Sequence, residues 1–582
     1  MTRRRTRILG IVAAGALALT ACASQDTDTP ADTGTDTTTG TDEQAASGGT
    51  VRVAETNAFT SFNPSVGANN LDINSKILGT MRADFIYLDN ELNIVPDESF
   101  GTYEVLSEDP LQVKYTINDD VVWSDGNAVD KGDMILSWAV QSGYFDGDEV
   151  LFEYAGSTEG LGLTGMPEFE GDRTMTVTYT EPYVDWEIAF SMAGAMPAHV
   201  VAEAAGIDEA QLIELIEGGT EGQPGDELKA VAEFWNTGFV TKELPSNEGI
   251  YLSNGPMIVS EMVADQSITL IRNENYAGDL VPNVDEITVR FIGDAAAAIS
   301  SLRNGEVDII APQPTVDSVQ EVTGMDGFTV LQGSQLSYDH LDLSFDSEVF
   351  ADANVREAFL KTVPRDVIID RLQKPLNENA EVLNSQIYLP SEGDLYTAAV
   401  AENGSDAYAE VDIEGAKELL AGATPTVRIL YNINNPIRVD TFSLIRDSAT
   451  QAGFQIEDGG SAEWGSELGT GTYDASIFGW ISSGVGSAGV PQIFSTNGGG
   501  NYNAYSNDEV DALATQLMVT TDSDEAEAIK RQIDTHLFAD AYGLPLFQSP
   551  GMIVHADNIG GVEYMPNQTG VWWNFWEWSV NE

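Results

Sequence analysis

The sequence is poor in the residues that most metal and thiol chemistry needs. It has a single cysteine, Cys22, among 582 residues, and only four histidines. A disulfide framework, a thiolate metal site and a cysteine nucleophile in the folded part are therefore excluded. The histidines lie far apart and lack the helical spacing of a zinc site: His199, His340, His536 and His555. We therefore expect no metal site and no cofactor.

Positive charge is also scarce. The chain has 26 Lys and Arg residues against 93 Asp and Glu, a formal net charge of −67. Removal of residues 1–21, which hold four arginines and no acidic residue, would make this charge −71. Phosphate backbones are bound by clustered Lys and Arg, so nucleic acid is excluded as a partner. Such acidity is typical of a solvated surface that keeps an exported protein soluble, although it also suits cationic ligands.

The N-terminus lacks an apolar run long enough for a membrane span. Residues 8–20 are uncharged and follow an arginine-rich start, which is the layout of a secretory signal. A spanning helix needs about 20 apolar residues, which disfavours a permanent anchor helix, and no later stretch approaches that length. The sequence therefore predicts a signal peptide over residues 1–21 and an exported protein.

The residues around Cys22 suggest how the exported chain is held. Leu19, Thr20, Ala21 and Cys22 resemble a bacterial lipobox. The resemblance implies that diacylglycerol modifies the thiol and that Cys22 becomes the first mature residue; the alternative is a free thiol near an ordinary cleavage site. Two acyl chains hold a protein stably on a membrane. We expect lipidation at Cys22 and an extracytoplasmic, membrane-anchored protein.

Residues 22–49 lack core-forming side chains. After Cys22 this segment contains no aromatic residue and no aliphatic residue larger than alanine. Its repeated aspartates favour extended conformations. We predict a disordered acidic linker over residues 22–49.

The remaining chain carries a series of short motifs. Residues 50–54 alternate as in a β-strand, and residues 133–141 have the pattern of a helix. The motifs that follow one another along residues 50–582 lie at 118–126, 133–138, 253–256, 273–276, 284–287, 302–308, 355–359, 473–480 and 501–507. In this order they resemble the family 5 extracellular solute-binding proteins of ABC importers, the group that includes dipeptide- and oligopeptide-binding proteins.

This resemblance implies an α/β fold of the two-lobed periplasmic-binding-protein type, type II with an extra subdomain, with mixed sheets joined by hinge strands. It implies that lobe I is discontinuous, that the subdomain is inserted into it, and that lobe II lies between its last two parts. The implied boundaries are 50–85, 186–312 and 545–582 for lobe I, 86–185 for the subdomain and 313–544 for lobe II.

The same resemblance implies that the protein is a monomer and no enzyme, and that it captures oligopeptides between its lobes and delivers them to the permease subunits of an ABC transporter. The residues expected at the ligand are Asn57, Phe59, Ser253, Asn254, Trp464, Trp480, Ser483, Asn501 and Tyr502. Broad aromatic rings suit such a surface.

One departure from the family bears on the ligand. In the peptide-binding members an aspartate three residues after the tryptophan pairs with the ligand's ammonium, whereas here Ser483 follows Trp480 at that distance. A neutral hydroxyl cannot form the same charge-assisted bond. Either another of the many carboxylates replaces the aspartate, with Asp474 and Glu467 among the candidates, or the ligand has no amino terminus. An oligosaccharide therefore remains the alternative ligand.

Two further alternatives remain open. Residues 571–578 alternate with period two, which predicts a strand buried on both faces, the other interpretation being an aromatic platform for sugar. A surface hydrolase with two carboxylates is the alternative from another class. No Gly-x-Ser-x-Gly elbow or phosphate-binding loop is present in the sequence.

Overall fold

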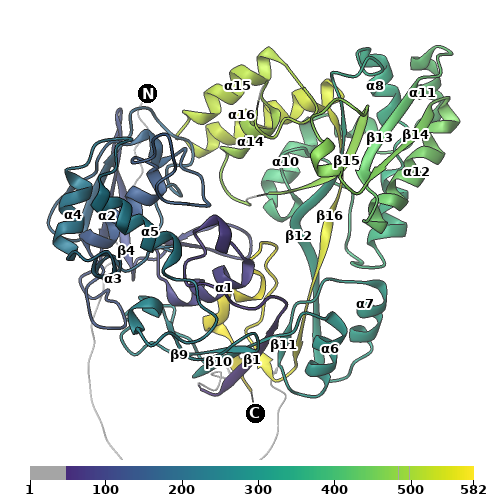
Figure 1. Ribbon diagram of the computed structural model, residues 1–582. Helices are drawn as coiled ribbons and strands as arrows, with labels where there is room; N and C mark the ends of the chain where they lie inside the picture. Colours follow the sequence, from purple (N-terminus) through teal and green to yellow (C-terminus); the bar gives the residue numbers. More distant parts are fainter. Residues whose placement is uncertain (1–47, 483, 497, 582) are drawn as a thin grey trace, which may run out of the picture. The chain divides into compact units, whose positions relative to one another are not determined.

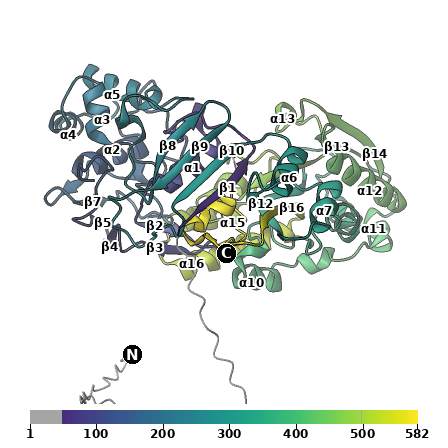
Figure 2. The same cartoon turned by 90° about the horizontal axis from the view of Figure 1, so that it is seen from below.

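A mixed sheet of ten strands organises the computed structural model, in the order β14-β13-β15-β12-β16-β11-β1-β10-β9-β8. The structure describes residues 48–482, 484–496 and 498–581, which belong to one compact unit over residues 45–582. In sheet order the strands are Gln455–Ser461, Thr426–Asn432, Ala475–Ile481, Phe328–Leu343, Gly543–Ala556, Ile309–Ile310, Thr50–Glu55, Glu286–Phe291, Ser267–Arg272 and Met257–Val263. Figure 2 shows the β8, β9, β10 and β1 end of this sheet.

Strands β12 and β16 are the longest and join the two halves of the sheet. They pair antiparallel over most of their length, side by side in Figure 1. The pairing shifts register between Ser334 and Tyr338. Just before the shift Gly333 lies opposite Gly551, and a Cβ on either glycine would collide with the Tyr564 ring. These glycines therefore let an aromatic ring cover β12 and β16, the crossing strands that join the two halves of the sheet.

A smaller antiparallel sheet has the order β4-β5-β7-β6. Its strands are Gly101–Glu108, Leu111–Ile117, Thr174–Thr178 and Glu168–Phe169. Two-stranded sheets pair β2 (Ile86–Leu88) with β3 (Ile94–Pro96) and β17 (Ile559–Gly560) with β18 (Ser579–Val580). The four-stranded sheet lies wholly within residues 101–178.

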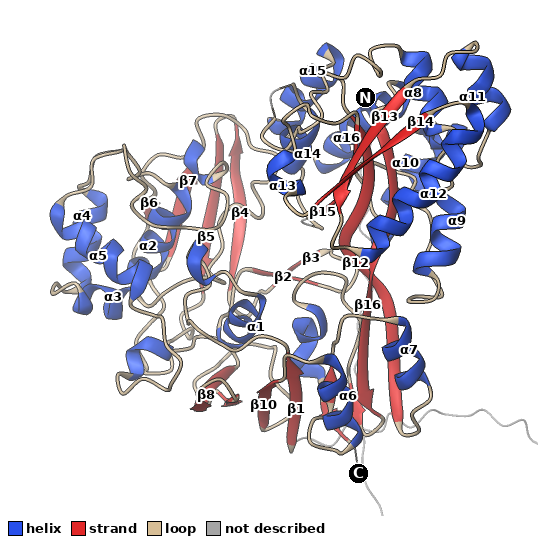
Figure 3. Cartoon of the chain, turned by 45° about the vertical axis from the view of Figure 1, so that its right-hand side comes forward, coloured by secondary structure: helices blue, strands red, loops and turns tan. Residues whose placement is uncertain are grey.

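Helices cover both halves, as Figure 3 shows. Those up to residue 323 are α1 Asp72–Met81, α2 Lys131–Ser142, α3 Ala198–Ala204, α4 Glu209–Glu217, α5 Asp226–Thr237, α6 Ala295–Arg303 and α7 Val316–Thr323. The others are α8 Ala353–Leu360, α9 Arg365–Ile368, α10 Asp394–Glu402, α11 Ile413–Leu420, α12 Pro436–Ala452, α13 Trp464–Glu467, α14 Gly489–Phe494, α15 Asp508–Met518 and α16 Ser523–Ala539.

Local sequence explains where helix α2 begins and ends. The Asp130 side chain caps α2 by accepting a hydrogen bond from the Gly132 N–H, and Gly143 ends the helix at a positive φ of 61°. The predicted strand at residues 50–54 and the predicted helix at 133–141 are confirmed as β1 and α2.

The buried apolar residues form two large cores. The first contains residues from 51–309 and 553–578, and the second contains residues from 341–547. Trp123 and Trp138 are fully buried in the first core. A smaller core joins α14, α15 and α16. This is the predicted two-lobed α/β fold; below, lobe I means the part with the first core, and lobe II the part with the second and the smaller core.

The strand predicted over residues 571–578 is wrong. The segment is a 3₁₀ helix, η7 (Gly570–Glu577), with a kink at Asn574. Only Ser579 and Val580 after it pair as a strand. The alternation in sequence failed as a guide because the segment packs on the first core instead of joining a sheet edge. Trp572 and Trp578 are buried in that core.

Among the residues that the structure describes, none of the helices combines the length and the apolar character that a bilayer crossing requires. The predictions for residues 1–21, Cys22 and most of the linker fall outside the described residues.

Candidate functional site

Four aromatic side chains gather beside strand β15, and we call them the β15 aromatic group: Trp464, Phe478, Trp480 and Tyr502. The Trp480 and Tyr502 rings are stacked, with centroids 5.8 Å apart and an interplanar angle of 11°. Phe478 meets both of these rings nearly edge-on, at 5.7 and 6.2 Å. Phe478 and Trp480 share one face of β15 because side chains alternate along a strand.

The β15 aromatic group is only partly covered. Phe478 is buried, whereas Trp464 and Trp480 are half-buried and Tyr502 is 38% exposed. The next residue of the strand, Ile481, is 62% exposed and lies on the opposite face of β15. Partly exposed aromatic rings that contact one another suit a contact surface for a ligand.

An ion pair between Arg438 and Asp339 lies beside the aromatic rings. The Arg438 guanidinium donates from Nε and Nη2 to the two carboxylate oxygens of Asp339, both at 2.8 Å. The same guanidinium lies 5.3 Å from the centre of the Trp464 ring. A Cβ at position 479 would lie 2.7 Å from Asp339 Oδ1, so Gly479 makes room for the pair beside Trp480. The charges of Arg438 and Asp339 therefore compensate each other.

The loop that presents Tyr502 is held by polar contacts. Asn501 Nδ2 donates to the carbonyls of Ser495 and Tyr505, and its Oδ1 accepts from the Tyr505 N–H. The Tyr473 hydroxyl donates to the Tyr502 carbonyl at 3.1 Å, and burial raises the pKa of this tyrosine. Asn501 thus lies next to the aromatic group but uses its amide to shape the loop.

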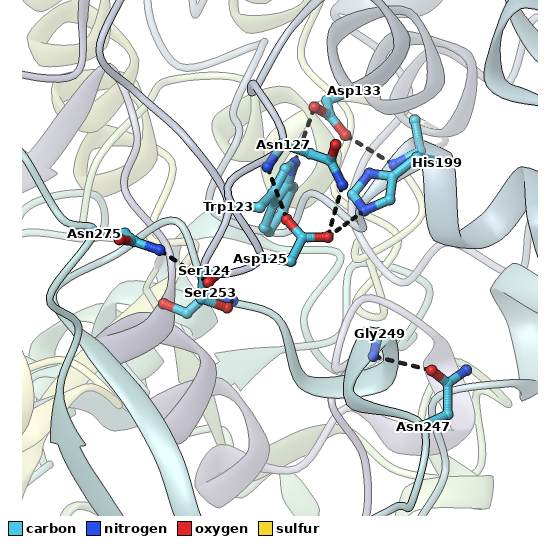
Figure 4. A network of polar contacts seen from close by, with 11 residues as sticks. Trp123, Ser124, Asp125, Asn127, Asp133, His199, Asn247, Gly249, Ser253 and Asn275 are labelled. Carbon is cyan, nitrogen blue, oxygen red and sulfur yellow. Dashed lines mark hydrogen bonds and ion pairs between the residues drawn. The ribbon is translucent and has the colours of Figure 1, made fainter.

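Ser253 and Asn254 lie in lobe I, away from the β15 aromatic group. The Ser253 hydroxyl donates to the Met81 carbonyl, and the Asn254 Oδ1 accepts from the Ala83 N–H. Both side chains are buried. Figure 4 shows Ser253 in a polar network with Ser124, whose carbonyl also accepts from Asn275. In this structure the two residues stabilise a turn.

The two remaining predicted residues of lobe I also lie apart from the aromatic group. Phe59 is 3% exposed and packs on Phe62 in the first core, with ring centres 4.7 Å apart. Asn57 is exposed and donates to Asp72. The structure therefore brings together Trp464, Trp480 and Tyr502 with Asn501 beside them, but not Asn57, Phe59, Ser253 or Asn254.

The two carboxylates considered as replacements at position 483 are engaged elsewhere, while Ser483 itself lies outside the described residues. Asp474 accepts hydrogen bonds from the Ser347 hydroxyl and from the Arg428 N–H. Glu467 lies 3.9 Å from the Arg428 guanidinium. Both carboxylates therefore already have partners within the protein.

Two cavities are lined by residues of both lobes. One of about 320 Å³ is bounded by Tyr183 and Glu181 of lobe I and by Pro491 and Met518 of lobe II. Another of about 310 Å³ lies at the crossing strands, bounded by Gly333, Gln548 and Tyr564 with residues 379–381 and 390–391. Such volumes lie at the lower end of the range for small-molecule sites, about 300–1,000 Å³.

One carboxylate cluster in the described residues has the spacing of a metal site: Asp130, Asp133 and Glu209. Burial raises the pKa of Asp133 to about 6 and that of Glu209 to about 7. The Asp133 oxygens already accept hydrogen bonds from Trp123 Nε1 and from the Ala198 and Asp130 N–H groups. Asp130 thus caps α2, and Asp133 anchors Trp123.

Sequence reasoning missed three members of the site: Phe478, Arg438 and Asp339. The position of Phe478, two residues before Trp480 in a strand, could have revealed it. The Arg438 and Asp339 pair is separated by 99 residues, and no local pattern connects the two.

Comparison with known proteins gives the same family as the motifs. A profile described as bacterial extracellular solute-binding proteins, family 5 Middle, matches residues 101–502. An uncharacterized lipoprotein of Mycobacterium tuberculosis is 24% identical over 596 residues, which covers 99% of each chain. The oligopeptide-binding protein OppA of the same species is 24% identical over 520 residues, covering 87% of this chain and 81% of OppA.

Among solved structures, the periplasmic EDTA-binding protein EppA has a TM-score of 0.75 at 21% identity, covering 92% of this chain and 97% of EppA. This similarity shows the shared fold. The profile spans more than half of the sequence and describes a group of extracellular binding proteins rather than enzymes. The protein belongs to the family 5 bacterial extracellular solute-binding proteins.

Proposed function

We propose that this protein is a lipid-anchored receptor that binds oligopeptides between its lobes and delivers them to an ABC permease. The observation that carries the proposal is the partly exposed β15 aromatic group, with Trp480 stacked on Tyr502. It lies on lobe II, in a fold whose lobes are connected by β12 and β16. The OppA relative binds oligopeptides by name, and the lipoprotein relative supports a lipid at Cys22.

The proposed binding mechanism uses both lobes. A ligand that contacts lobe I and lobe II at once favours the arrangement in which they are close, because only that arrangement supplies both sets of contacts. An extended peptide would offer backbone groups for hydrogen bonds and side chains for the aromatic rings. We keep Trp464, Trp480, Tyr502 and the loop around Asn501 as the ligand-binding part of lobe II.

The chemistry near the aromatic group favours a ligand segment without net charge. Arg438 is compensated by Asp339, and Asp474 and Glu467 have partners within the protein. A peptide bound by its middle, or one with a blocked end, fits this surface better than one held by its ammonium group. An oligosaccharide is the second candidate, because stacked aromatic rings beside hydrogen-bonding groups also suit sugar rings.

We also propose how the chain is divided into segments and attached to the membrane. Residues 1–21 would be removed, and residues 22–49 would connect the lipidated Cys22 to the folded part. Lobe I would consist of residues 50–85, 186–312 and 545–582, with residues 86–185 inserted, and lobe II of residues 313–544. The protein would act as a monomer without catalytic activity.

Titration separates the two ligand classes. Purified protein would be titrated calorimetrically with a pool of tri- to octapeptides and, in parallel, with a pool of neutral oligosaccharides. We expect heat and a raised melting temperature with peptides only. A response to sugars alone would replace the peptide proposal by the second candidate, and turnover of either labelled pool would show an enzyme. Native mass spectrometry of protein from its own host would identify the ligand carried.

A further inference from the structure

The carboxylate of Asp185 connects two segments that are about 300 residues apart. The Ser487 N–H donates to both of its oxygens, at 2.7 and 2.9 Å, and the Ala488 N–H donates at 2.9 Å. Hydrogen bonds to an ionised acceptor are about twice as strong as neutral ones. Asp185 is half-buried and Ser487 is buried. This contact therefore couples the lobe I segment before α3 to the lobe II segment before α14.

The residue preceding this contact is suited to it. Gly486 has a φ of +88°, a conformation that side chains other than glycine rarely adopt. A Cβ at this position would lie 2.9 Å from Asp185 Oδ2. Glycine thus allows the carboxylate to approach the backbone of lobe II closely.

Neighbouring contacts connect the same two segments. The Val184 N–H donates to the Met518 carbonyl at 2.9 Å. Gln492 Nε2 donates to Glu159 Oε1 at 3.3 Å, and this contact is exposed. The cavity of about 320 Å³ described above adjoins these residues. Asp185 supplies the carboxylate acceptor in this small interface.

The Asp185 contact lies close in sequence to the proposed ligand surface. Strand β15 carries Trp480 and ends at Ile481, and Ser487 follows six residues later. The strand end is fixed to the hinge strand β12, because the Ser482 N–H donates to the Leu336 carbonyl at 3.1 Å. A movement of residues 487–488 away from Asp185 would therefore act near the end of the strand that presents Trp480.

We infer that Asp185 is an interlobe latch whose carboxylate holds the N–H groups of Ser487 and Ala488 when the lobes are close and releases them when the lobes separate. This inference deepens the proposed function, because its consequence for ligand binding rests on that function. The latch favours the close arrangement before ligand arrives and adds to the stability of the ligand-bound state. Loss of the carboxylate charge would shift the population toward separated lobes.

The test compares the full-length protein with its Asp185→Asn variant and with Glu181→Gln as control. Glu181 is an exposed carboxylate that lines the same cavity, so the control removes the same charge without touching the latch. Hydrogen exchange measured by mass spectrometry would report on the amides of Ser487, Ala488 and Val184, and small-angle X-ray scattering would report the radius of gyration. Both measurements need no ligand.

In Asp185→Asn we expect exchange at the Ser487 and Ala488 amides to rise about tenfold, in line with the loss of charge-assisted hydrogen bonds. We also expect faster exchange at Val184 and a larger radius of gyration, with the control unchanged. Faster exchange at Ser487 and Ala488 alone would show a local loop contact and overturn the latch, as would wild-type exchange throughout. If Asp185→Asn folds poorly, Gly486→Ala is tested in its place. It obstructs the same approach of the carboxylate and should give the same changes in exchange and scattering.

A third measurement tests whether the latch contributes to ligand binding. The same peptide pool of tri- to octapeptides would be titrated into wild type and Asp185→Asn, and we expect about tenfold weaker binding through faster dissociation. If the wild type binds no peptide while exchange and scattering respond as expected, the proposed function fails and the latch stands. If binding is unchanged in a variant with separated lobes, the latch does not contribute to ligand capture.

Discussion

Two aromatic-rich regions of this protein look alike in composition but differ in structure. The C-terminal region contributes Trp572, Phe575 and Trp578 to the first core, where all three are buried. The β15 aromatic group leaves Trp480 half-buried and Tyr502 exposed. In the first region Trp572 packs on Trp578 inside a core that also contains aliphatic side chains, whereas in the second the rings pack on one another at a partly exposed surface.

Polar anchoring also differs between the regions. Trp572 Nε1 donates to Glu55 Oε1 at 2.7 Å within the core, which fixes the ring. Trp480 has its ring stacked on Tyr502, and Gly500 lies against its edge. Trp572 and Trp578 therefore contribute to the stability of the core, whereas part of the Trp480 ring stays accessible.

The largest expected effect is on stability in the C-terminal region. Trp578 is fully buried and packs on Trp572 at 5.3 Å. Trp578→Ala should lower the free energy of unfolding by about 3–5 kcal/mol, because it removes a large buried side chain and leaves a cavity. Urea denaturation followed by circular dichroism would measure this. If Trp578→Ala and Trp480→Ala lowered the free energy of unfolding equally, the two regions would not differ in their contribution to stability.

The next effect concerns ligand binding at the β15 aromatic group. Trp480→Ala should weaken binding of the peptide or sugar identified by titration by at least about tenfold, as expected for a central aromatic contact. Its cost in stability should be about 1 kcal/mol, the size of an aromatic pair contribution. Tyr502→Phe keeps the stacked ring and tests whether the Tyr502 hydroxyl adds to binding. Wild-type affinity in a folded Trp480→Ala protein would exclude this surface from the ligand site.

The smallest effect concerns a third tryptophan, Trp123, which is as buried as Trp578 but is anchored on Asp133 beside Glu209. Burial, together with the nearby Asp130 and Asp133 carboxylates, raises the pKa of Glu209 from 4.5 to about 7. Between about pH 4.5 and 7, Glu209 therefore keeps its proton in the folded protein, whereas the unfolded chain has lost it. The stability that this proton contributes is complete below about pH 4.5 and is lost as pH rises through about 7.

Glu209→Gln stays neutral, so its melting temperature should fall less than that of the wild type between about pH 5 and 8. Because Glu209 is half-buried, solvent screening keeps the difference small, on the order of 1 °C for a chain of this size. Differential scanning calorimetry across this range measures it, with the exposed Glu214→Gln on the same helix as control. Parallel pH curves for Glu209→Gln and wild type would contradict the prediction.

Local patterns predicted much of the fold. The alternation at residues 50–54, the helical pattern at 133–141 and the ordered motifs led to the two-lobed family. Period two misled at residues 571–578, where helical turns also place the larger rings on the core. Of the candidate site, Trp480 and Tyr502 were anticipated, while Arg438 was missed because its partner Asp339 lies on a distant strand.

The sequence alone determined the acidity, the absence of thiol chemistry in the folded part and the family, because these depend on composition and on short motifs in a fixed order. Only the tertiary structure decided which tryptophans are covered, which carboxylates already have partners, and that Asp185 meets the backbone of residues 487–488. The reason is that burial and hydrogen bonding depend on segments far apart in the chain, whose approach is set by the packing of the whole fold.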